Sequence, residues 1–209
     1  MRKYPKYKDC RIEWIQAVPE NWEVKPLKYL TSKIGDGLHG TPNYIESSDF
    51  FFINGNNIGN GIISLKENAK CVSEEEYLSN KKSLSQNSIL MSINGTIGSL
   101  AFYNNELVML GKSVAYINCK DIVNKEFVFY CLESEPVKNY INVELSGSTI
   151  KNLSLFTINN IPIPFPPIKE QTQIAKYLDY KTNQIETLIV NKQKLIELLQ
   201  EERTAIINH

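Results

Sequence analysis

The spacing of apolar positions divides the chain into two parts. Up to about residue 161, apolar residues come in short runs that glycine and asparagine interrupt, a pattern typical of β-strands and turns. From residue 169 to residue 208 there is no proline or glycine, and good helix formers dominate, which predicts one helix of about 40 residues. Four of the nine prolines lie in the connecting segment Ile161–Ile168, which should be extended and stiff. The pattern predicts a domain over residues 1–161, followed by residues 162–209 as a proline-rich junction and a long helix.

Shorter elements can be placed within the first part. The Asn94-Gly95 pair lies between two apolar runs, the strongest short signal for a β-hairpin, so we expect a hairpin that turns there. Further strands are expected at residues 50–54, 62–65, 107–110 and 114–118. Ser73 and Glu76 form a capping-box pattern that predicts a short helix through Lys81. Residues 125–145 are expected to be helical, with a break near Pro136. The expected fold class is α+β: a strand-rich mixed α/β domain followed by one long C-terminal α-helix.

The long helix carries a heptad pattern. With Ile174 at a d position, seven of its ten a and d positions are apolar: Ile174, Leu178, Ile185, Leu188, Leu195, Leu199 and Ile206. Lys181 and Lys192 interrupt the seam, and such polar interruptions can fix the register of a helix pair. A helix of this size is about 60 Å long, whereas a compact domain of this size is only about 30 to 35 Å across. The seam therefore needs a partner helix, and we expect it to mediate dimerisation.

Composition narrows the class of protein. Hydrophobic residues make up 42% of the chain, no apolar run reaches the length of a membrane span, and the basic first ten residues precede no apolar signal region, so we expect a cytoplasmic protein without membrane contact. The four cysteines and two histidines are scattered, which favours neither a disulfide scaffold nor a metal site. Basic and acidic residues balance at 23 each, but residues 1–33 carry eight basic against four acidic residues, so a locally basic face is possible. Ordinary solvated surface charge is the alternative.

Enzyme signatures are missing from the sequence. Gly111-Lys112-Ser113 lacks the upstream glycine of a phosphate-binding loop, and no dinucleotide-binding or base-methylation motif is found. A metal-dependent nuclease could be assembled only from Asp9 with Glu23 and Lys25, a pattern that recurs by chance in most chains. The sequence therefore predicts no catalytic residues and no cofactor.

Polar, glycine-rich loops are the candidate chemistry. They span residues 34–44, 54–60, 92–96, 112–113 and 146–151 and carry Asn, Thr, Ser, Lys and Tyr. Asn can pair with adenine and Lys with guanine, while Ser, Thr and backbone amides can hold phosphate. Turn chemistry alone also explains most of the Asn and Gly residues, so a structural role stays open for each of them.

Several segments together resemble the specificity subunits of Type I restriction-modification systems. They are Tyr7–Trp14 with Val18–Val24, Asn87–Gly98, Gly147–Thr149 followed by Leu153-Ser154, and Ile161–Gln171 with Ile174, Leu178 and Leu199–Arg203. The last of these resembles the family's junction between recognition domain and spacer helix and is the most specific. The resemblance covers nearly the whole chain.

The resemblance implies a target recognition domain that reads a few base pairs of double-stranded DNA. It also implies a helix that spaces two such domains and docks methyltransferase subunits, which would bind S-adenosylmethionine; a restriction subunit could complete the complex. Family members usually carry two recognition domains and two helices, whereas this sequence contains one of each, so it is either a natural half-length subunit or a fragment. A second copy can supply the missing partner helix. We therefore expect a homodimer in which the helices form an antiparallel coiled coil, and two-fold symmetry then predicts an inverted, interrupted DNA target.

The expected DNA contacts come from the polar loops, because the acidic run Glu74–Glu76 would be repelled by phosphate. They are His39, Thr41, Asn43, Tyr44, Asn56, Asn57, Asn94, Thr96, Ser148, Thr149 and Lys151, with Lys81, Lys82 and Lys112 nearer the phosphates. Two other functions stay open. One is a protein-interaction module that binds or regulates the methyltransferase without reading DNA, and the other is an enzyme that acts on DNA.

Overall fold

Two four-stranded sheets carry the fold, in a computed structural model that describes residues 4–10, 12, 15–65, 69–146 and 151–208. The first sheet has the order β11-β10-β13-β4 and is antiparallel throughout. Its strands are β4 (Thr31–Asp36), β10 (Ser88–Ser92), β11 (Leu100–Phe102) and β13 (Val114–Cys119). The second sheet has the order β12-β6-β9-β5, with one parallel pair, β12 with β6. Its strands are β5 (Tyr44–Ile45), β6 (Phe51–Ile53), β9 (Lys70–Val72) and β12 (Val108–Leu110).

The first sheet is covered on both faces, which explains its continuous apolar runs. Every residue of β10 and β13 is buried. Alternate side chains such as Ile89 and Ile117 join a core with Phe127 and Val128, while Leu90 and Tyr116 join a second core with residues of the other sheet such as Ile53. Because successive side chains of a strand point to opposite faces, helices pack on one face of this sheet and the second sheet lies against the other.

The remaining elements are short strand pairs and helices. The strand pairs are β1 (Tyr7–Asp9) with β2 (Ala17–Pro19), β3 (Glu23–Pro26) with β14 (Pro162–Phe165), and β7 (Ile58–Gly59) with β8 (Ile62–Ile63). Two 3₁₀ turns are η1 (Leu27–Tyr29) and η2 (Gly55–Asn57). The helices are α1 (Glu74–Asn80), α2 (Lys125–Glu133), α3 (Glu135–Leu145), α4 (Leu155–Asn159) and α5 (Ile168–Ile207). The α+β class with a long C-terminal helix is thus confirmed.

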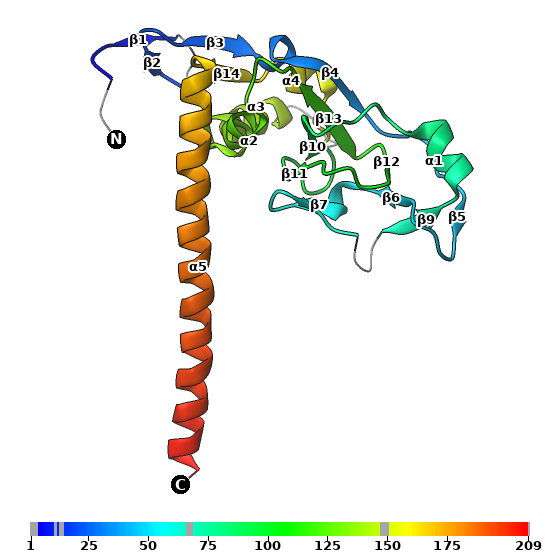
Figure 1. Cartoon of the computed structure of the whole chain (residues 1–209), viewed down its shortest axis with the longest axis vertical. Helices are drawn as coiled ribbons and strands as arrows, with labels where there is room; N and C mark the ends of the chain where they lie inside the picture. The colour runs from blue at the N-terminus through cyan, green and yellow to red at the C-terminus, as the bar shows by residue number, and fades with distance from the viewer. Residues whose placement is uncertain (1–3, 11, 13–14, 66–68, 147–150, 209) are drawn as a thin grey trace.

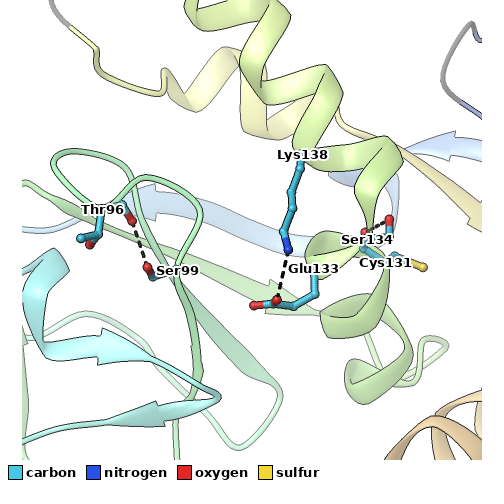
Figure 2. Close-up of polar contacts among 6 residues, drawn as sticks. All are labelled: Thr96, Ser99, Cys131, Glu133, Ser134 and Lys138. Atoms are coloured by element: carbon cyan, nitrogen blue, oxygen red, sulfur yellow. Dashed lines mark hydrogen bonds and ion pairs between the residues drawn. The ribbon is translucent and has the colours of Figure 1, made fainter. Parts of the chain in front are cut away.

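The hairpin predicted around Asn94 exists, but its turn differs from the prediction. β10 and β11 pair with Met91 opposite Leu100, so the connection is a loop over residues 93–99 rather than a two-residue turn. The Ser99 hydroxyl donates to the Thr96 carbonyl across 3.0 Å inside this loop (Figure 2). Asn94 does not close the turn because its backbone pairs with Asn152 instead. A tertiary contact therefore overrides the local turn preference.

Helix boundaries follow the predicted caps. The Ser73 hydroxyl accepts the backbone N–H of Glu76 at the start of α1. The break near Pro136 falls at Ser134, whose hydroxyl donates to the Cys131 carbonyl across 2.6 Å, and Lys138 reaches back over it to Glu133 at 3.7 Å (Figure 2). Two helices at an angle replace one, because proline cannot continue the hydrogen-bond ladder of α2.

The long helix α5 is anchored to the domain at its start. The side chain of Gln171 is fully buried, accepts the backbone N–H of Asn124 across 3.0 Å and donates to the Pro166 carbonyl across 2.8 Å. Ala175 is buried and Ile174 packs against the same core. From residue 183 to residue 208 every residue is exposed, and α5 extends away from the rest of the molecule (Figure 1). No helix among the described residues is long and apolar enough to cross a membrane.

Candidate nucleic-acid interface

Loops that are far apart in the sequence meet at one end of the two sheets. The strand registers place the end of β4, the end of β10 and the start of β13 at the same end of the first sheet. Backbone N–H groups then join the loops: Leu38 donates to Leu110 across 2.7 Å and Leu153 donates to Ile93 across 2.9 Å. The loops after β4, β6, β10 and β12 and the segment 151–153 therefore form one surface, which we call the loop cluster.

Polar side chains hold the loop cluster together. The Ser113 hydroxyl accepts the backbone N–H of Gly55 across 2.9 Å and donates to the side-chain oxygen of Asn54 across 3.1 Å. The Thr96 hydroxyl donates to the Gly55 carbonyl across 3.4 Å, and Ser92 lies 3.4 Å from the same hydroxyl. These contacts fix the loops after β6, β10 and β12 relative to one another.

Two glycines allow the loop backbones to touch. A Cβ atom on Gly37 would overlap the backbone of Leu110 and Gly111, and one on Gly111 would overlap the side chains of Asn54 and Phe52. Neither glycine is explained by a positive φ, so the requirement is space rather than backbone conformation. Gly37 and Gly111 thus meet a packing requirement of the loop cluster.

Most of the predicted contact residues in the described part of the chain are exposed. On the loop cluster these are His39, Thr41, Asn43, Asn56, Asn94, Thr96, Lys112 and Lys151. Tyr44 is also exposed, but it lies on β5, the outer strand of the second sheet. The ring of His39 lies 2.7 Å from the Asp36 carboxylate, which holds the imidazole at the start of its loop. The ammonium group of Lys70 lies 4.4 Å above the ring of Tyr44, which adds a cation that the sequence reasoning missed. No periodic signal marked the short strand β9 that carries Lys70.

Asn57 is a correction to the predicted contacts. Its side chain is 2% exposed, accepts the backbone N–H of Asn54 across 2.9 Å and donates to the Ser64 carbonyl across 3.1 Å. An asparagine in a turn can either face solvent or satisfy its own backbone, and at this position the second role wins. Its neighbour Asn56 is exposed and remains a candidate contact.

This difference gives a matched pair of variants. Asn57→Ala should lower the free energy of unfolding by about 1 to 3 kcal/mol, because a buried N–H and a buried C=O lose their partners. Asn56→Ala should change it by less than about 0.5 kcal/mol, as expected for an exposed side chain. Urea denaturation followed by circular dichroism measures both values. Equal stability of the two variants would contradict the structural role of Asn57.

Some predicted residues lie apart from the loop cluster or outside the described residues. Lys81 and Lys82 follow α1, and among the described residues no hydrogen bond or ion pair joins their side chains to the loop cluster; the ammonium group of Lys81 lies 5.8 Å from the Tyr77 ring. Ser148 and Thr149 fall in the segment 147–150, outside the described residues. Asn152, exposed and paired with Asn94, is an additional candidate contact from the same region.

An acidic cleft lies away from the loop cluster. It has a volume of about 710 Å³, is lined by Glu133, Asp179 and Glu186, and reaches Phe102 at the opposite end of β11 from the loop 93–99. The Tyr130 hydroxyl donates to Asp179 across 2.6 Å. Burial first, and then this hydrogen bond, raise the pKa of Tyr130, so the phenol stays protonated and links α2 to α5. Carboxylates repel phosphate, so this side of the molecule is unsuited to DNA.

Groups that could hold a metal ion are missing from the part of the chain that the structure describes. No cluster of three or more His, Cys, Asp or Glu side chains occurs within it. The Cys119 thiol is buried, and this burial raises its pKa to about 12.

The loop cluster offers amides, hydroxyls, an imidazole and ammonium groups, which suit hydrogen bonding to base edges and phosphates.

Comparison with known proteins gives matches along most of the chain. The family model described as type I restriction modification DNA specificity domain matches residues 19–199. The MjaIX specificity subunit of a type I restriction enzyme from Methanocaldococcus jannaschii is 25% identical over 189 residues, 89% of this chain and 43% of that protein. The EcoKI specificity subunit from Escherichia coli is 21% identical over 198 residues, 91% of this chain and 42% of that protein. The chain thus spans less than half the length of these relatives.

Solved structures share the fold. The HsdS subunit from Thermoanaerobacter tengcongensis superimposes with a TM-score of 0.62 at 21% identity, over 87% of this chain and 41% of that one. A chain from a study of complex assembly and conformational transition of the type I R-M system gives 0.60 at 23% identity, over 82% and 40%. At these identities the likeness concerns the fold alone.

Proposed function

The chain belongs to the family of type I restriction-modification DNA specificity domains, and on that premise we propose that it reads a DNA sequence for a type I complex without catalysing a reaction itself. The convergence of exposed Asn, Thr, His and Lys side chains on the loop cluster carries this proposal. These side chains come from loops far apart in the sequence, yet they share one end of the sheets. Such a surface can combine hydrogen bonds to base edges with hydrogen bonds and ionic contacts to phosphate groups.

The partners follow from the exposed half of α5. Its apolar residues from Ile185 to Ile206 have no cover within the described chain, and an exposed apolar stripe of this size marks an interaction surface. We propose that two copies pair through this stripe as an antiparallel coiled coil and that methyltransferase subunits dock on the pair. Two recognition domains related by two-fold symmetry would then read an inverted, interrupted target. A restriction subunit would join through the methyltransferase assembly.

Selection from random duplexes tests the reading of DNA. The chain, alone and together with its methyltransferase subunits, should enrich one motif in two inverted halves. In a duplex with that motif, Asn43→Ala should relax preference at one symmetric position by about 1 to 3 kcal/mol. Lys112→Ala should weaken binding to every sequence and flatten the dependence of the binding constant on salt.

The outcome separates this proposal from its alternative. Tyr29→Ala is a matched control, because Tyr29 is exposed in η1, outside the loop cluster, and its loss should leave both affinity and preference unchanged. No enriched motif in either preparation, together with retained binding of the methyltransferase, would favour a protein-interaction module that does not read DNA. Cleavage or methylation of DNA by the purified chain alone would instead identify an enzyme.

A further inference from the structure

The seam of α5 divides into a covered and a free segment. Ile174 packs on the core of its own domain and Leu178 lines an apolar pocket of that domain, so both are partly occupied. The free a and d positions with apolar side chains begin at Ile185, and their exposed fractions lie between 46% and 69%: Ile185, Leu188, Leu195, Leu199 and Ile206. Two charged residues, Lys192 and Glu202, occupy the a and d positions between them.

A parallel pair would place these charges against like charges. In a parallel coiled coil each a residue faces the same a residue of the second copy, and each d residue faces the same d residue. Lys192 would then face Lys192 and Glu202 would face Glu202 inside the seam. Two like-charge layers in one short seam disfavour the parallel arrangement.

An antiparallel pair offers a small set of registers. Each a residue then faces a d residue of the second copy, so the numbers of facing residues add to a constant that changes by seven between registers. When the sum is 394, Lys192 faces Glu202, Leu195 faces Leu199, and Leu188 faces Ile206. Every charge in the free seam then meets an opposite charge, and every one of these leucines meets an apolar residue.

Neighbouring registers lose this match. A sum of 387 places Lys192 against Leu195 and Glu202 against Ile185, and a sum of 380 places Lys192 against Leu188. A sum of 401 places Glu202 against Leu199. Each of these buries a charge against an apolar side chain, which is costly when the partner charge is lost.

The apolar residues that flank the a and d positions support the same register. A sum of 394 puts the two-fold axis at residue 197, between Ile196 and Leu198. In antiparallel pairs, residues that flank the seam near the axis lie close to their own copies. Ile196 and Leu198 are 48% and 53% exposed on the single chain, and both would be covered at this axis.

We propose that Lys192 and Glu202 pair across the dimer and fix its register, and thereby fix the distance between the two recognition domains. The proposal rests on the dimer of the proposed function and adds the residues that set its geometry. The helix becomes fully exposed at residue 183, which lies 14 residues from the axis. The two copies of residue 183, where each helix leaves its own domain, would then be about 42 Å apart along the helix pair.

Charge exchange tests the pairing. Lys192→Glu should raise the dimer dissociation constant by roughly tenfold or more, because both symmetric pairs become Glu facing Glu. The double variant Lys192→Glu with Glu202→Lys should restore the dissociation constant to within about threefold of the original, since each pair is again of opposite charge. Lys194→Glu makes the same charge change at a c position outside the seam and should have little effect. Sedimentation equilibrium measures all four proteins, and circular dichroism checks that each stays helical.

Spin labels measure the register directly. Among labels at f positions, Glu197→Cys should give the shortest distance between copies, because the two labels lie at the same height along the pair. The two labels of Val190→Cys should be offset by about 21 Å along the axis, so their distance should be clearly longer. A wild-type monomer would overturn both this proposal and the dimer of the proposed function. A stable dimer whose double variant stays as weak as Lys192→Glu, or whose labels come closest at residue 190, would overturn the register alone.

Discussion

Gly37→Ala should cost about 3 kcal/mol of unfolding free energy and abolish DNA binding at protein concentrations where the original chain is saturated. The added Cβ would overlap the carbonyl groups of Leu110 and Gly111, which are backbone atoms and cannot rotate away. The loop after β4 must therefore separate from the loop after β12, with loss of the bonds from Leu38 to Leu110 and from Gly37 to Val114. Urea denaturation and a fluorescence-anisotropy titration with target duplex measure the two effects.

Gly40→Ala is the matched control in the same loop. A Cβ at Gly40 would lie 3.8 Å from the Leu38 side chain, an ordinary contact distance, so stability and binding should stay near the original values. If Gly37→Ala binds DNA as well as Gly40→Ala does, then close approach of these loops does not form the binding surface.

Leu188→Glu combined with Leu195→Glu should convert the dimer to a monomer. Both side chains lie in the free seam, at 56% and 46% exposure on the single chain, so neither supports the fold of its own domain. Four buried leucines per dimer would be replaced by carboxylates, which predicts at least a thousandfold weaker association, on the order of 4 kcal/mol or more. Multi-angle light scattering should report the 23.9 kDa chain mass in place of twice that value.

A control with the same chemistry comes from the other faces of α5. Val190 and Ile207 are 66% and 68% exposed and occupy f and b positions, so Val190→Glu with Ile207→Glu should leave the dimer intact. Equal dissociation by both double variants would mean that the a and d seam is not the interface. A two-part DNA motif should also shrink to a single half-site when the dimer is lost.

The elements that sequence reasoning placed well are those whose signal is local and long. The absence of proline and glycine after residue 168 predicted α5 to within one residue at each end, and Ser73 predicted the start of α1. The apolar runs of β10 and β13 predicted strands because these are buried on both faces. In each case propensity, capping and burial agree, which is why one sequence was sufficient.

The elements that were missed depend on distant partners. β14 consists of alternating proline and apolar residues, and nothing local predicts that it pairs with β3 more than a hundred residues earlier. The loop cluster was predicted as a set of loops, but the same amide chemistry serves DNA contact and turn structure, so Asn57 was assigned wrongly. The heptad pattern likewise could not distinguish Ile174, which packs on its own domain, from Ile185, which is free.

Because the start of α5 is anchored to the domain, insertions in the helix that only lengthen it should be tolerated, whereas insertions that rotate the domain about the helix axis should not. Gln171 and Ala175 fix the first turns of the helix within the domain, so any rotation of the helix turns the whole domain with it. Seven extra residues between the anchor and the paired segment would move the domain by about 10 Å and turn it by only about 20°. One extra residue would move it by about 1.5 Å but swing its loops by about 100° around the helix axis, away from the groove that they faced.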